Sequence, residues 1–194
     1  MYSFKKINIK YSKKIQQIWI NSLPKNIYSI FGCETIQIYL KYFFLNQKNI
    51  AFGVFKKSEM IGFVLYGSDN SINNTILKKH FLFLFFNFVK SIFNDLKNLF
   101  FFIDVVIFYL FFNKDIKDDS LIELLIICMD KNYMNKGLGS KLLDYTTSII
   151  NKNFKNIIVK TLKKEFKNLN FYKKNSFDII ENQFGRIWLK RRFY

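Results

Sequence analysis

The chain has 194 residues, half of them hydrophobic, and this length and composition suit one globular domain with a substantial core. A disordered chain is excluded, because its low hydrophobicity could not offset the entropy lost on folding. The formal net charge of +17 would suit a nucleic acid or an anionic membrane. Its lysines, however, are scattered through every segment, so a nucleic-acid partner is not favoured.

The first third of the sequence predicts alternating helices and strands. Its apolar spacing indicates a strand over 4–9, helices over 13–23 and 34–45, and two strands of a hairpin within 50–68. Pro24 ends the first helix. The polar residues 56–59 form the hairpin turn. Neighbouring strands in this half are therefore expected to be antiparallel.

Residues 76–112 form a long apolar segment. The first part predicts an amphipathic helix with a stripe of Phe81, Leu84, Phe85, Phe88, Val89, Ile92, Phe93 and Leu96. The second part, 99–112, would be about 20 Å long as a helix, short of the roughly 30 Å of a bilayer core, and it contains Asp104. We expect a helical hairpin that docks by its stripe on the domain or a partner. A membrane-surface hairpin and a transmembrane span are alternatives.

The last third alternates strands and helices more regularly. It predicts a strand over 121–129, a helix over 137–151, a strand over 156–162, a helix over 165–174 and two strands between 177 and 193. Such alternation implies parallel neighbours in the sheet. The sequence therefore predicts a mixed α/β fold.

Cysteine and histidine usage disfavours metal sites and catalytic triads. Cys33 and Cys128 have neither the spacing of a zinc knuckle nor the number of a disulfide framework, which favours a reducing compartment. His80, the single histidine, is expected to face solvent beside Lys78 and Lys79. The N-terminus contains no apolar stretch of signal-peptide length, so a cytoplasmic protein is expected.

Two glycines, Gly137 and Gly139, stand between a predicted strand and a predicted helix. The N-terminus of a helix presents unpaired N–H groups and the positive end of its dipole, so this loop could bind a phosphate. The motifs of P-loops and of dinucleotide-binding folds are both incomplete here. The glycines alone leave open a phosphate loop or a helix start without a ligand.

Two motifs resemble those of the GNAT superfamily (Gcn-related N-acetyltransferases). NYMNKGLGSKLL, at 132–143, resembles its Gln/Arg-x-x-Gly-x-Gly/Ala pyrophosphate loop, and NFYKKNSF, at 170–177, resembles its Phe-Tyr-x-x-x-Gly-Phe signature. Their order and spacing match, and the resemblance covers nearly the whole chain except 76–112. Met134, Ser176 and Glu165 depart from the superfamily pattern, which has Gln or Arg, Gly and often Asn there.

The resemblance implies a single domain over 1–194 with a twisted mixed sheet of six to seven strands, flanked by helices, and with 76–112 inserted between the third and fourth strands. It implies acetyl-CoA as acyl donor, no metal, and direct acetyl transfer to an amine. The donor would lie between strands ending at Ile127 to Met129 and beginning at Ile157. The implied contacts are Ile127, Cys128, Met129, Met134, Asn135, Lys136, Gly137, Leu138, Gly139, Ser140, Asn168 and Tyr172.

The resemblance also assigns chemical roles. Tyr172 matches the general acid of the superfamily, and a phenol with a pKa of about 10 is protonated at neutral pH; a packed aromatic is the alternative. Glu123 matches a general base that often works through water, and the alternative is a carboxylate that is solvated or paired with a lysine. A backbone N–H near Met129 would stabilise the oxyanion. Cys128 is expected to be a core residue.

The acceptor side is rich in Phe and Tyr and poor in acids, which disfavours a polyamine. Lysines and aromatic rings would suit a small-molecule primary amine such as an amino sugar of surface-polysaccharide biosynthesis, carried on a nucleotide or a lipid. A protein or peptide N-acetyltransferase and a non-catalytic acyl-CoA-binding or membrane-surface module are alternatives. A homodimer and peripheral contact with the inner face of the membrane through 76–112 stay open.

Overall fold

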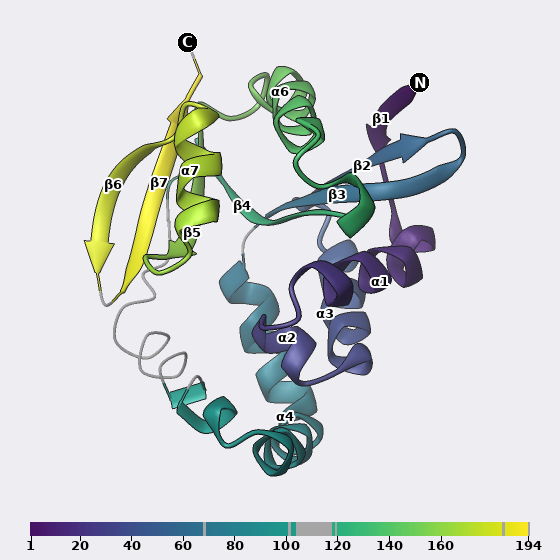
Figure 1. Ribbon diagram of the computed structural model, residues 1–194, viewed down its shortest axis with the longest axis vertical. Coiled ribbons are helices and arrows are strands. Elements are labelled where there is room, and N and C mark those ends of the chain that lie inside the picture. The colour runs from purple at the N-terminus through teal and green to yellow at the C-terminus, as the bar shows by residue number, and fades with distance from the viewer. Residues whose placement is uncertain (68, 101, 104–117, 119, 184, 194) are drawn as a thin grey trace.

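The computed structural model describes residues 1–67, 69–100, 102–103, 118, 120–183 and 185–193. In these residues one sheet of seven strands has the order β1-β2-β3-β4-β5-β7-β6 (Figure 1). The strands are β1 Tyr2–Lys6, β2 Ile50–Lys56, β3 Glu59–Gly67, β4 Leu121–Met129, β5 Asn156–Leu162, β6 Asp178–Gln183 and β7 Arg186–Arg192. The helices are α1 Ser12–Ser22, α2 Ile27–Ile30, α3 Cys33–Leu45, α4 Asp69–Asn94, α6 Leu138–Ile150 and α7 Phe166–Lys174, with short 3-10 turns η1 Ile9–Tyr11 and η2 Lys131–Tyr133.

Strand pairing confirms the predicted mixed sheet. β4 and β5 are parallel, and the other neighbouring pairs in the described sheet are antiparallel. The parallel pair needs a long crossover, which α6 supplies. The sheet therefore joins an antiparallel N-terminal half, β1 to β4, to a C-terminal half, β5 to β7, through a single parallel contact.

Helices cover both faces of the sheet and bury one core on each. On one face α6 and α7 pack against the strands, and a hydrogen bond of 2.7 Å joins Tyr66 of β3 to Thr146 of α6. On the other face α1 and α3 bury Trp19 and Tyr39 against Phe63. Figure 1 shows α6 and α1 on opposite sides of β2 and β3.

Most element boundaries agree with the sequence. β4 and β5 have the predicted bounds, and α1 ends at Ser22, just before Pro24. β1 begins at Tyr2, earlier than predicted. The short α2 was not predicted, because four residues are too few for a periodic pattern; Asn26 caps it by accepting a hydrogen bond from Tyr28 N–H at 3.0 Å.

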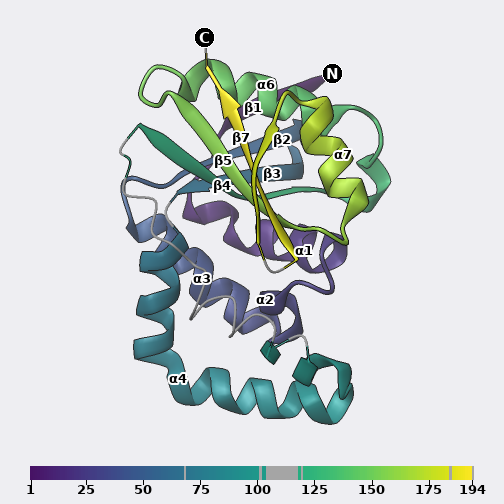
Figure 2. The same cartoon turned by 90° about the vertical axis from the view of Figure 1, so that its left-hand side faces the viewer.

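Helix α4 bends at His80, whose backbone is non-helical (φ −126°, ψ 23°). Ile72 and Ile76 before the bend and Leu84 after it are buried in the core with α1 and α3, and Figure 2 shows the helix running away from the sheet and then turning. His80 is half-buried, and its Nε2 lies 3.2 Å from the Tyr42 hydroxyl. The prediction of a solvent-facing histidine is therefore wrong, because α3 supplies a polar partner at the bend.

Half of the predicted apolar stripe in this segment is exposed. Leu84 is buried, whereas Phe81, Phe85, Phe93 and Leu96 are exposed. These residues do not dock on the described part of the domain, and their docking on a partner stays a prediction. Residues 97–100 and 102–103 are helical, and 104–112 of the predicted second part lie outside the described residues. Among the described residues we find no helix with the length and apolarity needed to span a membrane.

Candidate functional site

The two halves of the sheet separate at β4 and β5. These strands pair only from Leu121–Asn156 to Leu124–Val159, although β4 continues to Met129 and β5 to Leu162. The register of β4 against β3 also shifts after Leu124, which is the mark of a β-bulge. The ends of β4 and β5 are therefore not paired with each other, and we call this separation the opening.

The backbone N–H and C=O of Met129 point toward this opening. Asp130 N–H donates to Ile61 C=O at 2.8 Å, and backbone groups alternate in direction along a strand. The N–H and C=O of Met129 therefore point away from β3, toward the β5 side. Its carbonyl accepts a hydrogen bond of 2.7 Å from the Ser22 hydroxyl, the last residue of α1. The Met129 N–H is left to serve as a donor at the opening.

The loop that follows β4 presents a row of backbone donors. Asn135 (φ 59°) and Gly137 (φ 72°) have left-handed conformations, and α6 starts at Leu138. The N–H groups from Asn135 to Ser140 have no hydrogen-bond partner among the described residues; the first bond of the helix is donated by Lys141. Such a row at the positive end of a helix dipole is suited to an anion.

Two ammonium groups stand beside this loop. Lys136 lies 5.2 Å from the centroid of the Tyr133 ring and donates to Asn132 C=O at 2.8 Å. Lys56, on β2, lies 5.2 Å from the same ring and 3.4 Å from its hydroxyl. Lys56 was not predicted as a site residue, because it is 77 positions from Tyr133 in the sequence and no local motif marks it.

The two glycines of the loop serve different purposes. The left-handed backbone of Gly137 disfavours a side chain, although the space around it is open. A Cβ on Gly139 would lie 3.1 Å and 3.3 Å from two ring atoms of Phe171 on α7. Gly139 therefore lets α6 and α7 pack closely. The sequence motif predicted phosphate approach at both glycines, and it did not predict this helix contact.

Tyr172 of α7 is buried on the same face as α6. Its ring contacts the rings of Phe171 and Phe177, with centroids 5.3 Å and 5.5 Å away. Burial raises the pKa of its phenol, and the neighbouring Cys128 and Tyr66 raise it further. The hydroxyl has no hydrogen-bond partner among the described residues. The phenol is therefore protonated at neutral pH and can donate a hydrogen bond.

Glu123 is held in an ion pair just before β4 and β5 separate. Its carboxylate lies 3.2 Å from the Lys160 ammonium, and the two side chains are only 13% and 15% exposed. Lys160 in turn lies 4.6 Å from the centroid of the Trp188 ring. The flanking residues Ile122 and Leu124 belong to the core with α6 and α7, so Glu123 points to the opposite face. Glu123 thus forms the pair with a lysine that was the alternative to a role as general base.

The predicted contacts lie on β4, the loop after it, the start of α6 and α7, and their role in binding stays a prediction. Ile127 and Leu138 pack in the core with α6, Met134 is exposed at the loop, and Asn168 lies on α7 one turn before Tyr172. Cys128 is buried and burial raises its pKa, which disfavours a thiolate nucleophile. The described residues contain no group of three His, Cys, Asp or Glu side chains that could hold a metal.

Burial of Cys128 predicts a specific loss of stability at alkaline pH. Above the ordinary cysteine value of 9.0 the unfolded chain loses a proton that the buried thiol keeps, so the free energy of unfolding falls as pH rises. The slope contributed by this group approaches about 1.4 kcal/mol per pH unit. Urea unfolding between pH 7 and 10.5 should show a shallower decline for Cys128→Ala than for wild type. Cys33→Ala, at an exposed thiol, is the control and should keep the wild-type slope; equal slopes for all three proteins would contradict the prediction.

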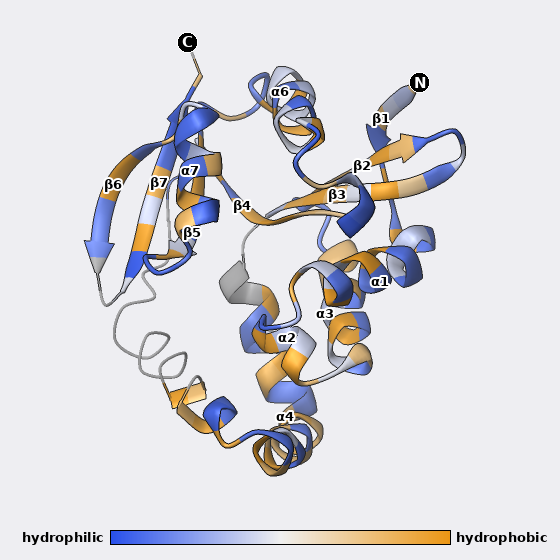
Figure 3. Cartoon of the chain, viewed as in Figure 1, coloured by the Kyte–Doolittle hydropathy of each residue, from blue (hydrophilic) through white to orange (hydrophobic). Residues whose placement is uncertain are grey.

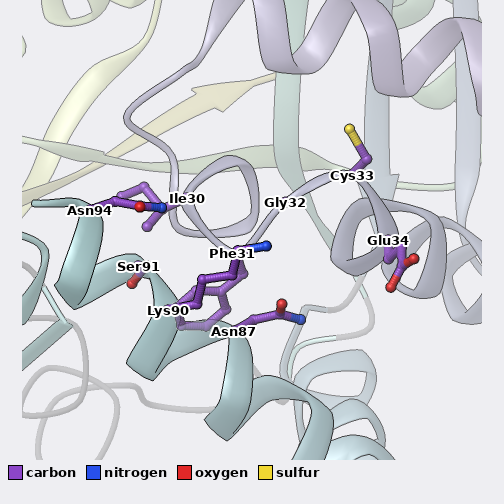
Figure 4. A pocket seen from close by; sticks show the side chains of 9 residues that line it. All are labelled: Ile30, Phe31, Gly32, Cys33, Glu34, Asn87, Lys90, Ser91 and Asn94. Atoms are coloured by element: carbon purple, nitrogen blue, oxygen red, sulfur yellow. The ribbon is translucent and has the colours of Figure 1, made fainter.

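A pocket of about 350 Å³ lies between the start of α3 and the part of α4 beyond the bend. Figure 4 shows its lining, to which α4 contributes Asn87, Lys90, Ser91 and Asn94 and the α3 side contributes Glu34. The pocket is on the α1–α3 side of the molecule. It offers a carboxylate, an ammonium and several amide and hydroxyl groups to a polar ligand.

Comparison with known proteins shows the fold. No protein-family model and no curated protein matches the sequence. Solved structures do match: the PaiA N-acetyltransferase from Thermoplasma acidophilum in complex with coenzyme A is 14% identical, with a TM-score of 0.62 over 100% of this chain and 99% of that one. A GNAT-family acetyltransferase from Streptococcus pneumoniae is 13% identical, with a TM-score of 0.58 over 100% of both chains. A ribosomal-protein alanine N-acetyltransferase from Escherichia coli is 9% identical, with a TM-score of 0.60 over 99% of this chain and 94% of that one.

Proposed function

We propose that this chain, which has the fold of the GNAT acetyltransferases, is an acetyl-CoA-dependent N-acetyltransferase that moves the acetyl group directly onto a primary amine. The observation that carries the proposal is the row of N–H groups from Asn135 to Ser140 beside the separated ends of β4 and β5. Acetyl-CoA supplies the thioester, and the following roles belong to residues of this chain.

The loop would hold the pyrophosphate of the donor. Its backbone N–H groups and the dipole of α6 favour an anion, and Lys136 and Lys56 add positive charge on the Tyr133 side. The unpaired edge of β4 would hold the pantetheine arm by backbone hydrogen bonds. This position would bring the thioester to the end of β4, next to Met129 and Tyr172.

Two groups at the opening, and Glu123 just before it on β4, would serve the transfer. Met129 N–H would donate to the carbonyl oxygen as it gains charge. Tyr172 would donate a proton to the departing thiolate, and its raised pKa keeps the proton in place at neutral pH. Glu123 would take the proton of the incoming ammonium, directly or through water. Because the amine attacks the thioester itself, the buried Cys128 is not needed as a nucleophile.

The acceptor that we propose is a small-molecule amine, with an amino sugar as the class to test first. The pocket between α3 and α4 is consistent with a polar acceptor, because Asn87 and Asn94 could bind hydroxyl groups while the reacting amine stays free to reach the thioester. A peptide N-terminus is the second candidate, since one structural neighbour is named for acetylating an alanine of a ribosomal protein. Thiol release from acetyl-CoA over a panel of amino sugars, amines and peptides would decide between them.

Ser140→Asp tests the anion site, because it should stabilise the folded chain and at the same time weaken its affinity for acetyl-CoA. Ser140 lies in the first turn of α6, where a carboxylate stabilises a helix by interacting with its dipole. The same charge would repel the pyrophosphate, so we expect the Kd for acetyl-CoA to rise about tenfold or more. Calorimetric titration measures the affinity, and thermal unfolding measures the stability.

Ser148→Asp provides the matched control. It places the same charge on an exposed position in the last turns of the same helix, away from the loop. Its affinity for acetyl-CoA should equal that of wild type. A folded Ser140→Asp protein that binds acetyl-CoA with the wild-type Kd would refute the placement of the pyrophosphate.

A further inference from the structure

The part of α4 beyond the bend turns an apolar face outward. Leu82, Phe85, Phe86 and Phe93 are 68%, 49%, 68% and 86% exposed, and their spacing puts them on one side of the helix. Leu96 and Phe100, which follow α4, are 70% and 73% exposed. We call the four α4 residues the outer face. Figure 3 shows hydrophobic residues on this segment, which lies at the end of the molecule away from the sheet.

The inner side of the same helical segment is partly polar. Ser91 is 4% exposed and Asn87 lines the pocket, while Leu84 and Phe88 supply the apolar contacts with the domain. A surface helix of a globular domain ordinarily has the reverse arrangement, with its polar side in water. The outer face is thus a contiguous apolar surface of the kind that marks an interaction site.

Positive charge flanks this face. Between residues 72 and 100 the chain carries four lysines, Lys78, Lys79, Lys90 and Lys97, and a single acid, Asp95. All four residues are exposed; the Lys79 ammonium lies 5.6 Å from the centroid of the Tyr42 ring on α3, and Lys90 lies between the outer face and the pocket that it also lines. An apolar helix face bordered by lysines, on a chain of net charge +17, is complementary to a surface that is apolar inside and anionic outside.

We propose that the outer face of α4 binds the surface of an anionic lipid bilayer, with the phenylalanine and leucine side chains among the acyl chains and the lysines at the headgroups. Long lysine side chains can reach the headgroup level while the helix lies in the interface. A second copy of this chain fits the face less well, because it would bring the same lysines and the same net charge against each other. The proposal is independent of the acetyl-transfer function.

Vesicle co-sedimentation tests the proposal with the full chain. The wild-type protein should bind vesicles of phosphatidylcholine and phosphatidylserine, bind vesicles of phosphatidylcholine alone at least about tenfold more weakly, and lose binding as salt is raised. The double variant Phe86→Ser/Phe93→Ser should partition at least about tenfold less, since two apolar side chains are removed from the contact. Lys90→Glu/Lys97→Glu should also bind anionic vesicles less.

A control separates this face from general hydrophobicity and charge. Leu45→Ser/Phe166→Ser removes side chains that are 65% and 71% exposed on other elements, and it should bind vesicles like wild type. Circular dichroism confirms that each variant is folded. The proposal is overturned if wild type does not sediment with anionic vesicles, if the outer-face variant binds as well as wild type, or if neutral vesicles bind equally. Light scattering that shows a dimer, dissolved by the same variant in the absence of vesicle binding, would assign the face to a second copy instead.

Discussion

Tyr172→Phe should lower kcat by about a hundredfold and leave the Kd for acetyl-CoA nearly unchanged. The substitution removes only the hydroxyl, and the ring keeps its contacts with Phe171 and Phe177. The effect is at the lower end of general-acid contributions, because a thiolate with a pKa near 8.5 leaves fairly readily without a proton. Steady-state kinetics with the best acceptor measures kcat, and calorimetry measures the affinity.

Tyr145→Phe is the control for this experiment. Tyr145 is half-buried on α6 and stacks on Phe4, so it loses the same atom at a position away from the opening. It should keep wild-type turnover. If Tyr172→Phe also keeps wild-type turnover, Tyr172 is a packing residue and the proton for the thiolate comes from elsewhere.

Glu123→Gln should reduce both turnover and stability, to different extents. If the carboxylate is the base, kcat falls by about a hundredfold or more, because an amide cannot take a proton from the ammonium. Removing one member of a mostly buried ion pair should also lower the free energy of unfolding, by up to about 3 kcal/mol. Lys160 keeps its contact with Trp188, which moderates that loss.

Lys160→Met separates the two effects. It removes the same ion pair but leaves the carboxylate of Glu123 in place. We expect a loss of stability similar to that of Glu123→Gln and a much smaller loss of kcat when both are measured at alkaline pH, where a carboxylate without its lysine is still ionised. Equal losses of kcat in the two variants would show that Glu123 acts only through the ion pair.

Regular elements of this fold could be predicted because their patterns are local. The continuous apolar run of β4 and the helical spacing of α1 and α3 each specify one structure, and the predicted mixed sheet was confirmed. The bend at His80 could not be predicted from the stripe, because it coincides with a contact with Tyr42, which is 38 residues away. The same stripe suggested a docking face, and only part of it packs on the domain, since periodicity shows that a helix has an apolar side and does not show what that side contacts.

The backbone conformation of the candidate site could be predicted where a local motif determines it. Contacts between side chains that are distant in the sequence could not be predicted. The loop at Gly137 followed from its residue types, and its left-handed conformation agrees with them. The contact of Gly139 with Phe171 and the approach of Lys56 to Tyr133 depend on how α7 and β2 pack, which no local pattern specifies. The pairing of Glu123 with Lys160 was foreseen only as a general alternative, without its partner.

The short pairing between β4 and β5 also bears on how a bound donor would affect the stability of the chain. Strand pairing joins the N-terminal and C-terminal halves of the sheet only from Leu121–Asn156 to Leu124–Val159, and elsewhere the halves are joined by the core that they share under α6 and α7. A donor lying between the separated ends of β4 and β5 would make backbone hydrogen bonds where the two strands make none with each other. By linkage, whatever binds there stabilises the folded chain as well. Binding of the donor would therefore raise the free energy of unfolding of the chain, and release of the product would lower it again.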